Sequence, residues 1–200
     1  MVDAKCLRRN ATRRLSVGQP ANRQASYATS YNLLIQVNVT TYLFNGTVDI
    51  TVDIAKKLDF ITLNAASMLN VSLVSITRTG TGSAPTGQMF RYPPLDYVVI
   101  RFESGIEVGK YLLRFAFSGS ILDGGLSGLY LSNYTDDGKK YGIASTQFEF
   151  YDARKMFVCF DEPAFKSNFT VTIIHDRAMN ATLSNMEIVS QTEVVGMPDW

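Results

Sequence analysis

The stretch YNLLIQVNVTTYLFNGTVDITVDI, residues 31–54, sets the fold of this 200-residue chain. Apolar and polar side chains alternate along it twice, with a break around Asn45-Gly46. Neighbouring side chains of a strand point to opposite faces, so a period of two is typical of a strand that buries one face. Asn-Gly is also a strong hairpin signal. The stretch therefore predicts two half-buried strands joined by a turn at Asn45-Gly46, with apolar faces formed by Leu33, Ile35, Val37 and Val39 and by Val48, Ile50, Val52 and Ile54.

Strand-like segments continue outward from this hairpin towards the end of the chain. Turn residues separate them at regular intervals, and no apolar stripe of period 3.6 is long enough for a substantial helix. The pattern predicts an all-β fold, a β-sandwich of mixed or antiparallel sheets, in a single domain spanning residues 29–200. The further predicted strands cover residues 60–64, 71–77, 95–102, 111–117, 129–132, 143–149, 169–174 and about 188–194.

The first 28 residues differ in composition from the rest. They carry six lysines and arginines against one acid, Asp3, and lack the apolar core of a signal peptide. A polar, Arg-rich segment buries too little apolar surface to fold by itself. We therefore expect residues 1–28 to be a disordered basic leader; a transit peptide is the alternative interpretation of the same composition.

The overall charge argues against one class of partner. A formal net charge of +1 and an isoelectric point near 7.7 provide no basic field, so we expect no nucleic-acid partner. The two cysteines, Cys6 and Cys159, are too few for a disulfide framework. Cys159 lies between aromatic residues, which favours a buried free thiol.

Asparagines in Asn-x-Ser/Thr triplets are unusually frequent. Such triplets are acceptors for N-linked glycans in secreted proteins. Their excess favours a protein that is secreted or exposed on the plasma membrane; the alternative is a Thr-rich cytoplasmic protein in which the triplets arise by chance. No apolar run is long enough (about 18 residues or more) to cross a bilayer. The seven candidate sites are Asn10, Asn38, Asn45, Asn70, Asn133, Asn168 and Asn180.

Gln147 and Glu149 are the candidate ligand-binding residues. They lie two positions apart in a predicted strand, so both should point to one face, while Phe148 and Phe150 point to the other. A carboxylate and an amide offer several acceptor oxygens, which suits a protonated amine. The alternative is that both are ordinary surface residues on an edge strand.

A cluster of charged residues follows among several aromatic residues. Charge in such surroundings is costly unless it is paired, so we expect ion pairs or turn caps here. Pro163 should end any regular structure. The charged members are Asp152, Arg154, Asp161 and Glu162.

This part of the chain resembles the N-terminal domain of the M1 family of zinc aminopeptidases, and the resemblance extends over about residues 31–200. Phe150 and Tyr151 depart from it, where the family usually has proline and threonine, and Val158 replaces another proline. The matching residues are Thr146-Gln147-Phe148-Glu149, Asp152-Ala153-Arg154, Phe157, Cys159-Phe160-Asp161-Glu162-Pro163-Ala164, Lys166, Phe169 and Leu183-Ser184-Asn185-Met186.

The resemblance implies a role for the candidate pair. In such a domain Gln147 and Glu149 would hold the free α-amino group of a peptide substrate. Zinc would belong to the full-length enzyme, in a catalytic domain that supplies a His-Glu-x-x-His motif. That motif does not occur in this sequence, and His175 is its single histidine. We therefore expect no metal site here, no activity of this chain alone, and as partners the peptide, the catalytic domain and a homodimer of the full-length protein.

Three hypotheses for the function follow. The first, which we favour, is that the chain is the substrate-anchoring front part of an aminopeptidase. The second is a free-standing, non-catalytic binding module, such as a truncated isoform or decoy. The third is an adhesion-type or carbohydrate-binding sandwich whose likeness to the family is structural only.

Overall fold

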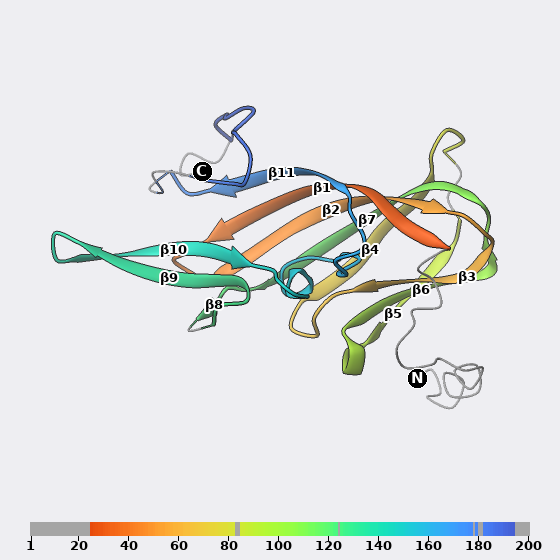
Figure 1. Cartoon of the computed structure of the whole chain (residues 1–200), viewed down its shortest axis with the longest axis horizontal. Helices are drawn as coiled ribbons and strands as arrows, with labels where there is room; N and C mark the ends of the chain where they lie inside the picture. Colours follow the sequence, from red (N-terminus) through yellow and green to blue (C-terminus); the bar gives the residue numbers. More distant parts are fainter. Residues whose placement is uncertain (1–24, 83–84, 124, 178, 180–181, 195–200) are drawn as a thin grey trace.

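Three sheets make up the fold (Figure 1). The structure is a computed structural model that describes residues 25–82, 85–123, 125–177, 179 and 182–194. A five-stranded sheet has the order β11-β1-β2-β7-β4, and two three-stranded sheets have the orders β3-β6-β5 and β10-β9-β8. The strands are β1 (Ser26–Asn38), β2 (Leu43–Ile54), β3 (Leu58–Asn64), β4 (Asn70–Arg78), β5 (Gly87–Tyr92), β6 (Tyr97–Ile106), β7 (Gly109–Ser120), β8 (Leu122–Asp123), β9 (Gly128–Asp136), β10 (Lys139–Gln147) and β11 (Asn168–His175).

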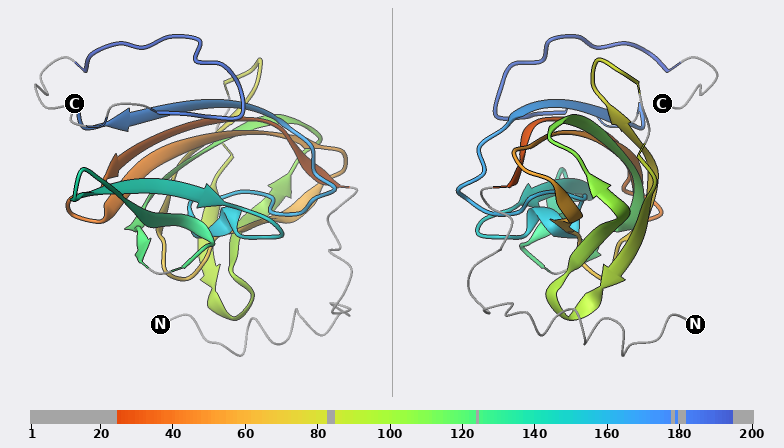
Figure 2. Two further views of the ribbon diagram at one scale, coloured as in Figure 1. Left: turned by 60° about the vertical axis from the view of Figure 1, so that its left-hand side comes forward. Right: turned by 90° about the vertical axis from the view of Figure 1, so that its right-hand side faces the viewer.

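The all-β sandwich predicted from the sequence is confirmed. Pairing is antiparallel except where β11 joins β1 and β8 joins β9, so two of the sheets are mixed and the β3-β6-β5 sheet is antiparallel. Helical structure in the described ranges is limited to two short 3-10 turns, η1 (Pro93–Leu95) and η2 (Ala153–Lys155). The five-stranded sheet forms one layer and the two smaller sheets lie against its inner side (Figure 2).

One hydrophobic core fills the space between the layers. The alternation predicted from residues 31–54 supplies much of it, because most of its predicted core-facing residues are almost completely buried. Val39 is half-buried and lies just after β1, whereas the buried members are Leu33, Ile35, Val37, Val48, Ile50, Val52 and Ile54. Burying each such side chain contributes about 1.5–3 kcal/mol. The facing layer adds Ile61, Leu63, Val98 and Ile100, all fully buried.

The predicted turn at Asn45-Gly46 is wrong. The β1–β2 turn lies earlier, between Asn38 and Leu43, and Asn45 and Gly46 are inside β2. The Asn38 side-chain oxygen accepts hydrogen bonds from the backbone N–H groups of Thr40 (3.0 Å) and Thr41 (2.9 Å), which fixes this turn. Glycine is needed at position 46 for packing, since an added Cβ would lie 2.8 Å from the Phe117 ring and 2.1 Å from a backbone oxygen.

Other boundaries also differ from the prediction. β1 begins at Ser26, so the last residues assigned to the leader pair with the end of β2 instead. Residues 188–194 form no strand: they join none of the three sheets, and Val189 is 100% exposed. β5 and β8 were not predicted, because neither shows a clear alternation of apolar and polar residues. Alternation alone does not make a strand when no partner is available to pair with it.

The β9–β10 hairpin is a long arm that projects beyond the rest of the molecule (Figure 1). Its tip is stiffened by Tyr134 and Tyr141, whose rings stack at 5.1 Å. The base of the arm returns to the sandwich at Gln147, the last residue of β10. The fold therefore delivers one member of the candidate pair to the point where the arm joins the core.

Candidate amine-binding turn

Gln147 and Glu149 are both exposed and lie on either side of a half-buried Phe148. The strand stops at Gln147, so Glu149 belongs to the turn that follows and not to the strand predicted for residues 143–149. The peptide bond between Glu149 and Phe150 is cis. The amide and carboxylate thus extend from neighbouring positions of backbone, although strand alternation is not what orients the carboxylate.

An aromatic cluster holds this turn against the core. The Phe148 ring meets Phe157 edge to face at 6.1 Å, and Phe157 meets Tyr31 and Phe169 in the same way. Tyr31 and Phe169 stack at 4.5 Å across the β1–β11 pairing. Such contacts contribute about 0.5–1.5 kcal/mol each beyond simple burial. Phe148 therefore anchors the backbone between the two polar residues.

The charged segment 152–161, which we call the clamp segment, is held by an internal ion pair. Arg154 Nε lies 2.8 Å from Asp161 Oδ2, with the two side chains only 17% and 8% exposed. The Arg154 backbone N–H also donates to Oδ2 (3.2 Å), and its guanidinium donates to the Asp161 carbonyl (3.2 Å). Because buried charges need partners, the two residues depend on each other. Asp161 cannot at the same time offer both of its oxygens to a ligand.

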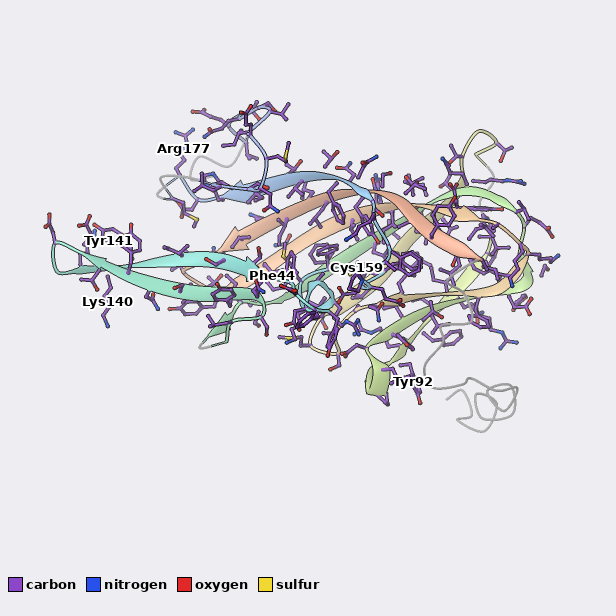
Figure 3. All side chains as sticks on the ribbon, in the orientation of Figure 1. Phe44, Tyr92, Lys140, Tyr141, Cys159 and Arg177 are labelled. Carbon is purple, nitrogen blue, oxygen red and sulfur yellow. The ribbon has the colours of Figure 1, made fainter. Side chains whose placement is uncertain are left out.

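The clamp segment is also fastened to the end of β3. Asn64 and Cys159 exchange backbone hydrogen bonds of 2.7 and 3.1 Å, and the Asn64 side-chain oxygen accepts from the Asp161 N–H at 3.2 Å. The Ala66 N–H donates to the Arg154 carbonyl at 2.8 Å. Figure 3 shows Cys159 in the interior of the molecule. The clamp segment therefore belongs to the core, although its sequence carries no periodic pattern.

Asp152 forms the second ion pair of the segment. Lys155 Nζ lies 2.8 Å from Asp152 Oδ1 and also donates to the Ser127 hydroxyl at 2.8 Å. The next residue, Gly128, has φ +67°, and a Cβ there would lie 2.7 Å from the Lys155 side chain. These contacts tie the clamp segment to the start of β9. The Glu149 turn directly follows the end of β10, and the clamp segment after it is attached to the start of β9. The backbone around Glu149 is therefore connected to both strands of the β9–β10 arm.

Burial determines the ionisation of two groups in this region. It raises the pKa of the Tyr31 hydroxyl, and the neighbouring Cys159 and Asp161 raise it further. Burial also raises the pKa of the Cys159 thiol, with Asp161 adding to the effect. Both groups are therefore protonated at neutral pH, and the Tyr31 oxygen accepts a 3.0 Å hydrogen bond from the Phe160 N–H. Cys159 is a buried free thiol, as predicted; Cys6 lies outside the described residues.

Glu162 and Pro163 directly follow the clamp segment. The Glu162 N–H donates to the Phe160 carbonyl, and its own carbonyl accepts from Phe165, so the backbone turns here. Pro163 is exposed just after this residue, and no strand begins again before Asn168. Beside them is a hollow of about 170 Å³, lined by Tyr31, Phe150, Ala153, Phe157, Cys159, Phe160, Asp161, Glu162, Pro163, Phe165 and Phe169.

Sequence reasoning did not identify three residues that support the site: Tyr31, Asn64 and Ser127. Asn64 contacts Asp161 across 97 residues of chain, and Tyr31 contacts Phe160 across 129. Nothing in the local sequence around either residue points to such a distant partner. The one available signal was the residue type at position 64. A polar asparagine directly after an apolar strand, if buried, needs a hydrogen-bond partner, and this need could have pointed to a distant contact.

The candidate glycosylation sites fall into two groups. Asn45, Asn70, Asn133 and Asn168 are exposed, and Asn38 is half-buried in the β1–β2 turn. Asn10 and Asn180 lie outside the described residues. None of the described asparagine sites is fully buried.

Within the described ranges, no group of three or more His, Cys, Asp and Glu side chains is arranged to hold a metal ion. His175 ends β11, where its Nδ1 lies 2.9 Å from the Asp176 carbonyl oxygen. One imidazole does not form a zinc site, so these residues do not fit that metal. No helix among the described residues is long and apolar enough to cross a membrane.

The fold and this turn define a class of protein: a β-sandwich domain that presents an exposed amide and carboxylate on a rigid support. The family model of the peptidase M1 N-terminal domain matches residues 27–196, and the chain belongs to this family. It is 32% identical to bovine glutamyl aminopeptidase over 168 residues, which cover 82% of this chain and 17% of the relative.

Other relatives agree with this assignment. Aminopeptidase M1 of Arabidopsis thaliana is 33% identical over 176 residues, covering 87% of this chain and 20% of its own length. Mouse aminopeptidase Q is 36% identical over 159 residues, covering 75% of this chain and 28% of its own. The chain therefore spans less than a third of the length of these relatives.

Proposed function

We propose that this chain is the substrate-anchoring N-terminal part of a zinc metalloaminopeptidase that removes single residues from the free N-terminus of peptides. Its family membership and the names of its relatives support this function. The observation that carries the assignment to particular residues is the exposure of Gln147 and Glu149 on a turn that the aromatic cluster and the clamp segment hold rigidly.

In this proposal the Glu149 carboxylate neutralises the substrate ammonium group, and the Gln147 side-chain oxygen accepts a further N–H. Hydrogen bonds to charged groups are stronger than neutral ones, so most of the binding energy would come from Glu149. Fixing the amine sets its distance to the first peptide carbonyl, which limits cleavage to one residue at a time. Zinc, held by a catalytic domain outside this chain, would activate the water for hydrolysis.

The test is Glu149→Ala in the longer protein that contains the catalytic domain. Losing a charged hydrogen-bond partner costs about 1.5–3 kcal/mol, so kcat/KM for peptides should fall about 10- to 150-fold. Glu103→Ala, which removes an exposed carboxylate from β6, is the matched control and should leave kcat/KM unchanged. Equal kinetics of the Glu149 and Glu103 variants would refute the anchoring role.

The second candidate function is a free-standing module that binds peptide amines without cleaving them. It rests on the same exposed pair, Gln147 and Glu149, which could bind an amine without any catalytic group nearby. Titration of this chain with one peptide, free and N-acetylated, tests it. Weaker binding of the acetylated peptide supports amine recognition; equal binding of both forms excludes it.

We further propose that the protein is secreted or lies on the extracellular face of the plasma membrane, and that its full-length form is a homodimer. The seven glycosylation triplets support the secretory route. Treating the native protein with a glycosidase tests it: a fall in mass supports the route, and an unchanged mass favours the cytoplasmic alternative.

A further inference from the structure

Four of the candidate glycosylation sites lie on one face of the five-stranded sheet. Asn45 in β2 pairs with Gln36 of β1 on one side and with Ser118 of β7 on the other. Asn70 in β4 pairs with the same Ser118 from the opposite side. Paired residues of adjacent strands point to the same side of a sheet, so these side chains share a face.

The other two sites extend this face across the sheet. Asn38 lies two positions beyond Gln36 in β1, and alternation returns it to the same side. Asn168 pairs with Ser30 in the parallel β1–β11 ladder, one position before the core-facing pair of Tyr31 and Phe169. The four triplets therefore come from β1, β2, β4 and β11 but point in one direction, away from the core.

Charged pairs lie at the centre of this outer face, beside the apolar side chains of Leu34 and Leu112. Arg114 and Asp49 form a two-bond ion pair across β2 and β7 at 2.6 Å, and Lys110 and Asp53 form a longer one at 3.7 Å. Asn45 and Asn70 are both exposed, so a bulky group on either one extends into solvent. Larger neighbours lie only beside Asn45, where Gln36 and Leu43 share its face; the remaining neighbours are the small residues Thr47, Ser72, Ala116 and Ser118.

Asn38 is compatible with a glycan even though its side chain fixes the β1–β2 turn. Its Oδ1 accepts the Thr40 and Thr41 N–H groups, whereas a glycan is attached through Nδ2. Attachment leaves the carbonyl oxygen in place, so the turn can persist. Asn45, Asn70 and Asn168 are exposed and have no such constraint to meet.

We propose that the outer face of the five-stranded sheet is a glycan-covered face, modified at Asn38, Asn45, Asn70 and Asn168. In each reaction Nδ2 forms a bond to the anomeric carbon of a lipid-diphosphate-linked saccharide, the lipid diphosphate leaves, and Nδ2 gives up one proton. The inference rests on the proposed secretory route and is independent of amine binding by Glu149. Glycans on the outer face would keep other domains away from it. Any further domain of the protein would therefore contact the side of the sandwich formed by the two smaller sheets, or the sheet edges.

Two neighbouring glycans would stand close together on this face. Asn45 and Asn70 are separated by one intervening strand, so their backbones are about 10 Å apart at the usual spacing of strands. Glycans at both sites would shield the centre of the sheet, including the ion pair between Arg114 and Asp49. Enzymatic removal of the glycans should therefore expose this face to proteases and to charged reagents.

Alternation in strands could by itself place asparagine and threonine on a solvent face, so the test uses engineered triplets at two native asparagines. Leu34→Thr creates a triplet at Asn32, which is exposed on the outer face of β1. Ala66→Thr creates one at Asn64, which is 8% exposed and faces the clamp segment. The wild-type chain and both variants are secreted from eukaryotic cells behind a cleavable signal peptide, and occupancy is mapped by glycosidase treatment in heavy-oxygen water with mass spectrometry.

We expect glycans at Asn38, Asn45, Asn70 and Asn168 of the folded wild-type chain, a further one at Asn32 in the first variant, and none at Asn64 in folded protein of the second. Expression of Ala66→Thr in bacteria checks whether the substitution itself prevents folding. Empty outer-face sites in secreted, folded protein would overturn the proposal, as would occupancy of Asn64 equal to that of Asn32. Failure of the Glu149 test would not affect these readouts, and an unmodified native protein would refute modification in the natural setting.

Discussion

The clamp segment and the segment after β11 differ in a way their sequences do not suggest. The clamp segment has no apolar periodicity, yet Met156, Phe157, Val158 and Cys159 are buried. The later segment contains the alternating residues 188–194, yet these join no sheet, and they are exposed except for the half-buried Val194 (Figure 2). One exposed ion pair, between Arg177 and Glu193 at 2.9 Å, connects them to the residues just after β11. Figure 3 shows Arg177 on this side of the molecule. Specific partners, rather than patterning, decide which irregular segment becomes part of the core.

If specific partners hold the clamp segment in the core, Arg154→Ala should cause the largest loss of stability. Removing one member of the buried pair leaves Asp161 charged without its partner, which costs about 3–5 kcal/mol. Chemical denaturation of the 200-residue chain measures the loss. A variant with wild-type stability would mean that the ion pair does not hold the clamp segment.

Alkaline pH should weaken the same region. The pKa values of Cys159 and Tyr31 are raised above their ordinary values of 9.0 and 10.0, chiefly by burial, so the unfolded chain releases these protons first. The stabilisation is complete below about pH 9 and is lost progressively as the pH rises, by up to about 1.4 kcal/mol per pH unit for each group.

Unfolding curves recorded between neutral pH and pH 11 measure this loss. Cys159→Ala and Tyr31→Phe should each flatten the alkaline part of the profile. A profile that is unchanged in both variants would show that other groups cause the decline.

Tyr31→Phe should have a smaller effect at neutral pH. It keeps the ring contacts with Phe157 and Phe169 but removes the acceptor of the Phe160 N–H, which costs about 1–3 kcal/mol when the donor is left buried. Tyr27→Phe, at an exposed position of the same strand, is the matched control and should be neutral. The difference in unfolding free energy between the two variants isolates the hydrogen bond.

The smallest effect is expected from Arg177→Ala. Its partner Glu193 is 80% exposed, and exposed ion pairs contribute about 0–1 kcal/mol. Global stability should stay within that range of wild type. A loss of unfolding free energy as large as that of Arg154→Ala would mean that both segments are held equally firmly. The contrast between the clamp segment and the segment after β11 would then be wrong.

The sequence was a good guide wherever one residue pattern was sufficient. Alternation in β1 and β2 identified the core-facing residues, and charge among aromatics identified Arg154 and Asp161. It misled at Asn45-Gly46, because a glycine selected for packing against Phe117 looks the same as one selected for a turn. Partners such as Asn64 were invisible, since their contacts are made only by tertiary folding.

The pairing of β11 with β1 also constrains how the molecule forms. Ser167 donates to the Ala28 carbonyl across 139 residues, and the β1–β11 ladder continues from there to His175. During synthesis the first strand must therefore wait, with one edge unpaired, until nearly the whole domain has emerged. Contacts so distant in sequence slow folding, and a waiting edge is a site of mispairing with other chains. Until β11 arrives, the nascent chain therefore presents an unpaired β1 edge that favours aggregation.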